Sequence, residues 1–209
     1  MNADLREIYD RFATTYDANR SQFDISEIYE KFFSSLPVKQ GVALDLGCGA
    51  GEPFARQFAD RGWKVTGVDF SSKMLELAAR YVPEMKTIHG DMREVEFGES
   101  TFDAIVAVYS LFHVPRAGHP RLFSRFARWL KPHGKVLFTY ATKEYTGSER
   151  FEGTKDFLGE TLFYSHETPE VLFEQLSAAG LAVDSADYHE VGGETFLWVT
   201  AVTRKTDSS

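Results

Sequence analysis

An apolar segment followed at once by three closely spaced glycines constrains the fold of this chain more than any other feature. Residues 42–46 read Val-Ala-Leu-Asp-Leu, which predicts a buried parallel strand, and glycines follow at positions 47, 49 and 51. A helical segment begins near Pro53. Glycines in such a loop let the backbone turn tightly and let a ligand lie against bare peptide. This unit of strand, glycine loop and helix therefore predicts a nucleotide-binding site.

Two acidic residues at this loop bear on which nucleotide it binds. In a dinucleotide-binding loop the third glycine is the sixth residue of G-x-G-x-x-G, so that a pyrophosphate rests on the helix N-terminus. Glu52 occupies that position here, and Asp45 lies two residues before the first glycine. Two carboxylates repel a pyrophosphate but suit a ligand that carries an ammonium and a sulfonium group. Glu52 can equally be a first-turn residue that complements the helix dipole.

Four further segments follow the glycine loop in a fixed order. Two of them are strands that end in an acid, because Asp69 lies 24 residues after Asp45 and Asp91 lies 22 residues after Asp69. The segments are Val65-Thr66-Gly67-Val68-Asp69-Phe70-Ser71, His89-Gly90-Asp91-Met92, residues 102–114 and residues 130–138. Together with the loop they make the chain resemble the class I S-adenosylmethionine-dependent methyltransferases, of the small-molecule type, over much of residues 42–140.

The resemblance implies S-adenosyl-L-methionine as the cofactor and S-adenosyl-L-homocysteine as its product. Open parallel sheets bind ligands at the carboxyl ends of their strands. There the loop glycines would face the methionine part, the first acid its ammonium, the second acid both ribose hydroxyls, and the third acid the adenine amino group. The residues that the resemblance places at the cofactor are Asp45, Gly47, Cys48, Gly49, Gly51, Asp69, Phe70, Asp91, Met92, Tyr109 and, at the cofactor carboxylate, Arg20.

Four side chains are candidates for the acceptor site. Methyl transfer is an in-line displacement that holds the acceptor roughly 3 Å from the methyl group, and a base is needed chiefly when the acceptor enters protonated. Tyr9 and Tyr16 lie in a segment similar to the entrance helix of many small-molecule methyltransferases, although their spacing also suits ordinary packing on one helical face. His113, after the fourth strand, is the best candidate base, but histidine there often has a structural role in the family. His166 precedes a helix and can equally be a boundary residue.

The alternation of apolar and helical patterns predicts an α/β fold. We expect a Rossmann-like, doubly wound sheet of seven strands at 42–46, 64–69, 86–89, 103–108, 134–140, 181–189 and 195–203, with helices on both faces. The last two strands are too close for a crossover helix, so they form an antiparallel hairpin. We expect a single domain, in which residues 1–36 form a helical cap, 42–140 the cofactor-binding core, 141–167 a phenylalanine-rich lid, and 168–203 the final helix and hairpin.

Composition narrows the partners of the chain. Its 209 residues carry a net charge of −8, which argues against a general nucleic-acid or anionic-membrane surface. No early apolar run predicts a signal peptide or a membrane span. Cys48 is the only cysteine, so an intrachain disulfide is excluded, and the six histidines lack metal-ligand spacing. We therefore expect a cytoplasmic protein, monomer or homodimer, without a metal.

The leading hypothesis is methyl transfer from S-adenosylmethionine to a small-molecule acceptor by in-line displacement. One alternative is a non-catalytic module that keeps the cofactor pocket to sense the metabolite or to bind a partner. Another is a methyltransferase that acts on protein or RNA. A nicotinamide-dependent reductase is disfavoured by Glu52 and by the terminal hairpin.

Overall fold

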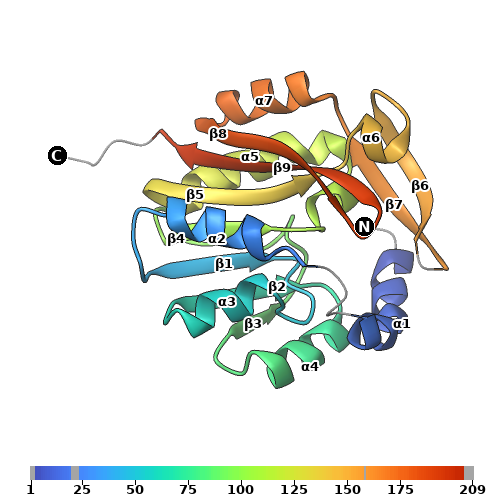
Figure 1. The fold of residues 1–209 in the computed structure, drawn as a ribbon, viewed down its shortest axis with the longest axis horizontal. Coiled ribbons are helices and arrows are strands. Elements are labelled where there is room, and N and C mark those ends of the chain that lie inside the picture. The colour runs from blue at the N-terminus through green and yellow to red at the C-terminus, as the bar shows by residue number, and fades with distance from the viewer. Residues whose placement is uncertain (1–2, 20–23, 158, 205–209) are drawn as a thin grey trace.

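A seven-stranded sheet forms the centre of the protein (Figure 1). The computed structural model describes residues 3–19, 24–157 and 159–204, except for the side chains of residues 3, 4, 14 and 16–19. In chain order the elements are α1 (Ala3–Asn19), α2 (Ser26–Ser35), β1 (Val42–Leu46), α3 (Phe54–Asp60), β2 (Lys64–Asp69), α4 (Ser72–Tyr81), β3 (Lys86–His89), β4 (Phe102–Ala107), two 3₁₀ turns at Leu111–His113 and Arg116–Gly118, α5 (His119–Trp129), β5 (Leu130–Tyr140), α6 (Lys143–Thr146), β6 (Phe151–Phe157), β7 (Glu160–His166), α7 (Pro169–Ala178), β8 (Leu181–Val191) and β9 (Glu194–Thr203).

The strand order confirms the predicted doubly wound topology. It is β3-β2-β1-β4-β5-β9-β8, and the first five strands in this order run parallel to one another. β9 is antiparallel to both β5 and β8, so the terminal hairpin closes one edge of the sheet as expected. The chain winds outward from β1 to β3 and then returns to start β4 on the other side of β1. The carboxyl ends of β1 and β4 therefore flank the point where strand order reverses, which is where such sheets bind ligands.

Alternate residues of each central strand pack on opposite faces of the sheet. Leu44 and Leu46 of β1 belong to one core with residues of α5 and α7, whereas Ala43 packs in a second core with residues of α2 and α3. This period of two follows from the strand geometry and explains why the parallel strands are apolar on both sides. Two of the buried polar residues, Asp45 and Asp69, lie at or next to the carboxyl ends of β1 and β2.

Local sequence signals fix where the helices that frame this edge begin. The Ser71 hydroxyl accepts a hydrogen bond from the Met74 amide at 3.1 Å and caps α4 directly after β2. Thr168 caps α7, with Pro169 in the first turn, where its missing N–H costs nothing. Gly180 follows this helix with a φ of 85°, a left-handed conformation that glycine adopts without strain at a helix end.

The segment 141–167 has more regular structure than the sequence suggested. After the short helix α6 it forms a separate antiparallel pair, β6–β7, in which Phe151 lies opposite His166 and Phe157 opposite Glu160. Figure 1 shows this pair and α1 at the same end of the sheet, beyond the carboxyl ends of the parallel strands. Arg11 of α1 forms an ion pair with Glu160 at 3.1 Å, and the rings of Phe12 and Phe157 lie 5.9 Å apart. The two segments therefore cover the edge where a ligand would bind.

Candidate active site

A cavity of about 800 Å³ lies at the carboxyl ends of the parallel strands. Its floor comes from the ends of β1, β2 and β4, and its cover comes from α1, the start of α2 and the β6–β7 pair. Among the predicted site residues, those that line it are Tyr9, Asp45, Gly47, Cys48, Gly49, Asp69, Phe70, Met92, Tyr109 and His113. The fold thus brings together side chains from five separate stretches of sequence.

The glycine loop turns sharply and uses its own amide groups. Gly47 and Cys48 both donate to the Val68 carbonyl, at 2.8 and 3.1 Å, and Gly49 donates to Asp69 Oδ2 at 2.9 Å. The N–H groups of these three residues are therefore committed within the protein. A phosphate cradle needs such groups to point at the ligand. The loop geometry thus favours a ligand that is held by carboxylates over one held through a pyrophosphate.

The glycines themselves are required for different reasons. Gly47 has a φ of 73°, and a Cβ there would lie 2.4 Å from the Cβ of Ser110. At Gly49, with a φ of 50°, an added Cβ would meet no atom within 4 Å, because this position faces the open cavity. Gly51 does not line the cavity, which differs from the prediction. A Cβ there would lie 2.8 Å from Cγ2 of Val82, so this glycine is needed for close packing.

Two buried carboxylates give the cavity floor its electrostatic character. Asp45 and Asp69 are 6% and 7% exposed. Burial, together with the charge of Asp69, raises the pKa of Asp45 to about 7. Burial also raises the pKa of Asp69 to about 6, although hydrogen bonds from the amides of Ser71 and Gly49 oppose that shift. Both carboxylates are thus destabilised as anions, and a cation placed between them would relieve the cost.

The third predicted acid is placed differently. Both carboxylate oxygens of Asp91 accept hydrogen bonds from the Arg93 side chain, at 2.6 to 3.1 Å. Burial would raise the pKa of Asp91, but the hydrogen bonds and charge of Arg93 hold that pKa below its usual value. Asp91 does not line the cavity, whereas Met92 does. The predicted contact between Asp91 and an adenine therefore stays a prediction, and in this structure the carboxylate is paired with Arg93.

Tyr9 and His113 come from opposite sides of the cavity and meet over it. The Tyr9 hydroxyl lies 2.7 Å from Nε2 of His113, and Nδ1 of His113 lies 2.6 Å from the Phe163 carbonyl oxygen. A carbonyl can only accept, so Nδ1 carries the proton and Nε2 accepts from the tyrosine. Burial lowers the pKa of His113 to about 4, so the ring is neutral near pH 7. The pair therefore orients the tyrosine oxygen, with histidine as its acceptor.

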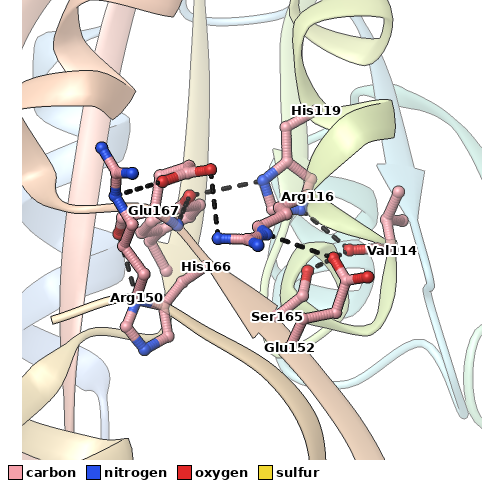
Figure 2. Close-up of polar contacts among 9 residues, drawn as sticks. Val114, Arg116, His119, Arg150, Glu152, Ser165, His166 and Glu167 are labelled. Atoms are coloured by element: carbon pink, nitrogen blue, oxygen red, sulfur yellow. Dashed lines mark hydrogen bonds and ion pairs between the residues drawn. The ribbon is translucent and has the colours of Figure 1, made fainter. Parts of the chain in front are cut away.

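Hydrogen bonds and ion pairs connect the segment that follows His113 to the β6–β7 pair. Figure 2 shows the Val114 carbonyl with two partners, Nε2 of His119 at 2.9 Å and the hydroxyl of Ser165 at 2.6 Å. Beyond it, Arg116 forms ion pairs of 3.4 Å with both Glu152 and Glu167. These contacts join the strand β7, the turn after β4 and the start of α5. They fix the histidine relative to the segment that covers the cavity.

Several predicted residues lie elsewhere or are not described. His166 is fully buried outside the cavity, and its ring nitrogens contact the Thr146 hydroxyl at 2.7 Å and the Glu167 carbonyl at 3.0 Å. This position corrects the prediction of a catalytic His166, because the ring is used to fasten α6 to the end of β7. Arg20 and the side chain of Tyr16 lie outside the described residues.

Most residues at the acceptor end of the cavity were not among the predicted site residues. They are Tyr29, Phe54, Phe112, Phe157, Leu162, Tyr164, Val191, Glu194 and Phe196. For Phe157, Leu162 and Tyr164 the signal was the high apolar content of 141–167, which is greater than a solvated loop needs. Glu194 gave no signal, since a carboxylate beside a hairpin turn is ordinary. Cys48 does line the cavity, but burial raises its thiol pKa well above the usual value, so it stays protonated.

The described part of the chain lacks two other kinds of feature. No group of three or more His, Cys, Asp or Glu residues there is arranged to hold a metal ion. In the same residues, no helix has the length and apolar character that crossing a lipid bilayer requires.

Comparison with known proteins agrees with this geometry. Residues 43–134 match a family described as a methyltransferase domain. YqeM, a Bacillus subtilis protein named as a methyltransferase, is 35% identical over 136 residues, which are 63% of this chain and 54% of that protein. A demethylmenaquinone methyltransferase of Lactobacillus johnsonii is 32% identical over 146 residues, covering 64% of this chain and 59% of the relative. The chain thus matches little more than half the length of these two relatives.

A solved structure supports the fold over nearly the whole chain. The 1,6-didemethyltoxoflavin-N1-methyltransferase of Burkholderia thailandensis, solved with 1,6-didemethyltoxoflavin and S-adenosylhomocysteine, superimposes with a TM-score of 0.71. The match covers 95% of this chain and 88% of that one at 20% sequence identity. The resemblance in the sequence is confirmed: residues 43–134 lie in a class I methyltransferase-like domain.

Proposed function

We propose that this chain, which carries a class I methyltransferase-like domain, transfers a methyl group from S-adenosylmethionine to a small-molecule acceptor. One observation carries the proposal: two buried carboxylates, Asp45 and Asp69, flank a glycine loop whose first three N–H groups are already hydrogen-bonded. Such a floor suits the ammonium and ribose hydroxyls of S-adenosylmethionine and disfavours a pyrophosphate.

The cofactor would lie across the carboxyl ends of β1, β2 and β4. The ribose hydroxyls would take the place of the Gly49 and Ser71 amides as donors to Asp69, or share its oxygens with them. Phe70 and Met92, which line the cavity beyond β2 and β3, offer an apolar surface to the adenine. Gly49 opens directly onto this space, so its bare backbone lets the methionine part approach.

The reaction needs positioning more than it needs a strong base. The nucleophilic atom of the acceptor forms a bond to the methyl carbon while the carbon–sulfur bond breaks, and the sulfur keeps the electron pair and becomes a neutral thioether. The cofactor thereby loses its positive charge. Holding the two reactants in line in a site that excludes water can supply much of the acceleration.

Tyr9 is placed to orient the acceptor. Because its proton points to His113, the tyrosine oxygen would meet an N–H or O–H of the acceptor as a hydrogen-bond acceptor. Because its pKa is about 4, the His113 ring stays neutral at neutral pH and does not keep a second proton. We therefore assign His113 the role of orienting Tyr9. A proton that the acceptor loses is released to solvent, so the reaction does not require His113 to hold it.

The cofactor assignment is tested by titration calorimetry of the purified chain with S-adenosylhomocysteine. We expect saturable binding, and we expect Asp69→Asn to weaken it at least tenfold, about the loss that follows when one charged hydrogen-bond partner is removed. Asp187→Asn, an exposed acid on β8, is the matched control and should bind normally. Absence of saturable binding, or tighter binding of NAD, would refute the proposal.

Catalysis is tested separately with methyl-labelled S-adenosylmethionine and a fractionated metabolite pool. Transfer of label to small molecules supports the proposal, and transfer only to protein or RNA would change the acceptor class. Binding of the cofactor without any transfer, in the unsubstituted chain and in Tyr9→Phe alike, would instead favour the non-catalytic module.

A further inference from the structure

The cavity extends well beyond the part assigned to the cofactor. Its far end lies under the start of β9, where Glu194 and Phe196 line it together with Tyr109, Phe112 and Tyr164. β9 is the third strand from β1 in the order β1-β4-β5-β9. Three spacings of neighbouring strands separate β1 from β9 by about 14 Å, and Glu194 also lies along β9 from Thr200, the residue level with Asp45, so the two acids are more than about 14 Å apart. This acid belongs to the acceptor end of the cavity.

Aromatic rings form a continuous wall at this end, which we define as Tyr109, Phe112, Tyr164 and Phe196. The Phe112 ring stacks between those of Tyr164 and Phe196, with centroids 5.2 and 5.1 Å away. Tyr109 meets Phe196 edge-on at 5.5 Å. A wall of this kind presents apolar surface to the body of an acceptor. It also lowers the polarity around the carboxylate beside it.

The charges that line the cavity have one predominant sign. Five described lining residues are acidic, namely Asp24, Asp45, Glu52, Asp69 and Glu194, and Arg56 is the only lysine or arginine among the described lining residues. The Arg56 guanidinium forms ion pairs with Asp60 at 3.2 Å and Glu84 at 3.7 Å, and neither of these acids lines the cavity. The described walls therefore offer poor recognition for an acceptor that carries a carboxylate or a phosphate.

The negative charge of the Glu194 carboxylate is only partly compensated by neighbouring groups of the protein. This half-buried carboxylate interacts with the Tyr145 hydroxyl and with the charge of Lys155, yet burial still raises its pKa. Lys155 does not line the cavity, since its ammonium lies on the Tyr145 ring, 4.2 Å from the centroid. An ammonium entering from the cavity side would meet the carboxylate from the direction that the lysine leaves open.

Resting on the proposed function, we propose that the acceptor is an apolar or aromatic amine, bound as an ammonium ion with this nitrogen at Glu194 and its body against the aromatic wall. The ammonium nitrogen has no lone pair, so it anchors the acceptor, and an unprotonated atom elsewhere in the acceptor attacks the methyl group. The site would thereby use one carboxylate pair for the cofactor and a separate carboxylate for the acceptor. Acceptors that carry a carboxylate at the corresponding position would be rejected by charge.

The inference is tested with matched probes that differ in one charged group. Tryptamine is compared with indole-3-propionate, and phenethylamine with 3-phenylpropionate, by calorimetry at pH 7.5, where the amines are cationic and the acids anionic. Each probe is titrated into the free chain and into the complex with S-adenosylhomocysteine. We expect each amine to bind at least tenfold more tightly than its acid, about the preference that one hydrogen-bonded charge pair confers.

Two variants locate the effect. Glu194→Gln should reduce the preference to less than about threefold while the affinity for S-adenosylhomocysteine stays unchanged, because the two sites are about three strands apart. Glu190→Gln is the matched control, since it removes the same charge from an exposed position on the same hairpin. Equal or tighter binding of the acids, or an unchanged preference in Glu194→Gln, would overturn the inference. Failure of S-adenosylhomocysteine to bind would refute the proposed function. The comparison of amine and acid probes on the free chain would still test whether the cavity prefers an ammonium ion at Glu194.

Discussion

Binding of the cofactor should release protons, because the floor of its site holds carboxylates that are partly protonated near neutral pH. The pKa of Asp45 is raised to about 7 and that of Asp69 to about 6. An ammonium or a pair of ribose hydroxyls favours the ionised form of each carboxylate, so each pKa falls when the ligand binds. The direction is fixed by linkage: affinity must rise with pH until both groups are ionised in the free protein.

The size of the effect follows from these two pKa values. At pH 6.5 the fraction protonated is about three quarters for Asp45 and about one quarter for Asp69, so about one proton should leave for each ligand bound. Between pH 6 and 7.5 the affinity for S-adenosylhomocysteine should increase about fifteenfold, from a factor of about eight at Asp45 and about two at Asp69. Most of this change belongs to Asp45, whose higher pKa keeps it protonated over more of the range.

Calorimetry in buffers with different ionisation enthalpies counts the released protons directly. In Asp45→Asn the proton count at pH 6.5 should fall to about a quarter, and the change in affinity between pH 6 and 7.5 to about twofold. Asp187→Asn should behave like the unsubstituted chain. A proton count near zero in the unsubstituted chain would refute the reasoning, since it would mean that the ligand meets neither carboxylate in its ionised form.

Three further predictions concern the loop, the floor and the cover of the cavity. Gly47→Ala should lower the free energy of unfolding by about 3 kcal/mol or more, measured by urea denaturation, because it adds a close contact with Ser110 to the backbone strain. Gly49→Ala should lower the free energy of unfolding by only about 1–2 kcal/mol, yet abolish S-adenosylhomocysteine binding, because its methyl group points into the cavity. Equal losses of stability in Gly47→Ala and Gly49→Ala would contradict this prediction. Asp45 destabilises the free protein as the pH rises from about 4 to about 7, the interval between its unfolded and folded pKa values. In thermal melts Asp45→Asn should therefore be more stable than the unsubstituted chain by up to about 4 kcal/mol at pH 8 and nearly equal to it at pH 4. A stability difference that does not change with pH would contradict this prediction. Tyr9→Phe should reduce the turnover of methyl-labelled cofactor roughly tenfold to a hundredfold with unchanged S-adenosylhomocysteine affinity, and full activity in this variant would remove Tyr9 from the proposed site.

The sequence determined the framework of the site. Neighbouring strand residues such as Ala43 and Leu44 place apolar side chains on opposite faces, helix starts carry Ser71 and Thr168 as caps, and the short connection at 192–193 permits only a hairpin. Each of these signals is local, since a few neighbouring residues settle the backbone geometry. The glycine loop and the acids near the carboxyl ends of β1 and β2 could be found in the same way, because strand ends in a parallel sheet must meet at one edge.

Only the tertiary structure decided which side chains meet at that edge. Asp91 and His166 carry suitable chemistry, but neither lines the cavity. Asp91 accepts hydrogen bonds from Arg93, and the His166 ring contacts the Thr146 hydroxyl of α6. Tyr9 and His113 are 104 residues apart, and their contact depends on how α1 and the β6–β7 pair close over the sheet. Burial, which sets the pKa of Asp45 and leaves Glu194 in an aromatic surrounding, is a property of the assembled core. A linear sequence specifies neighbours along the chain, whereas desolvation and long-range pairing arise only when distant segments pack together.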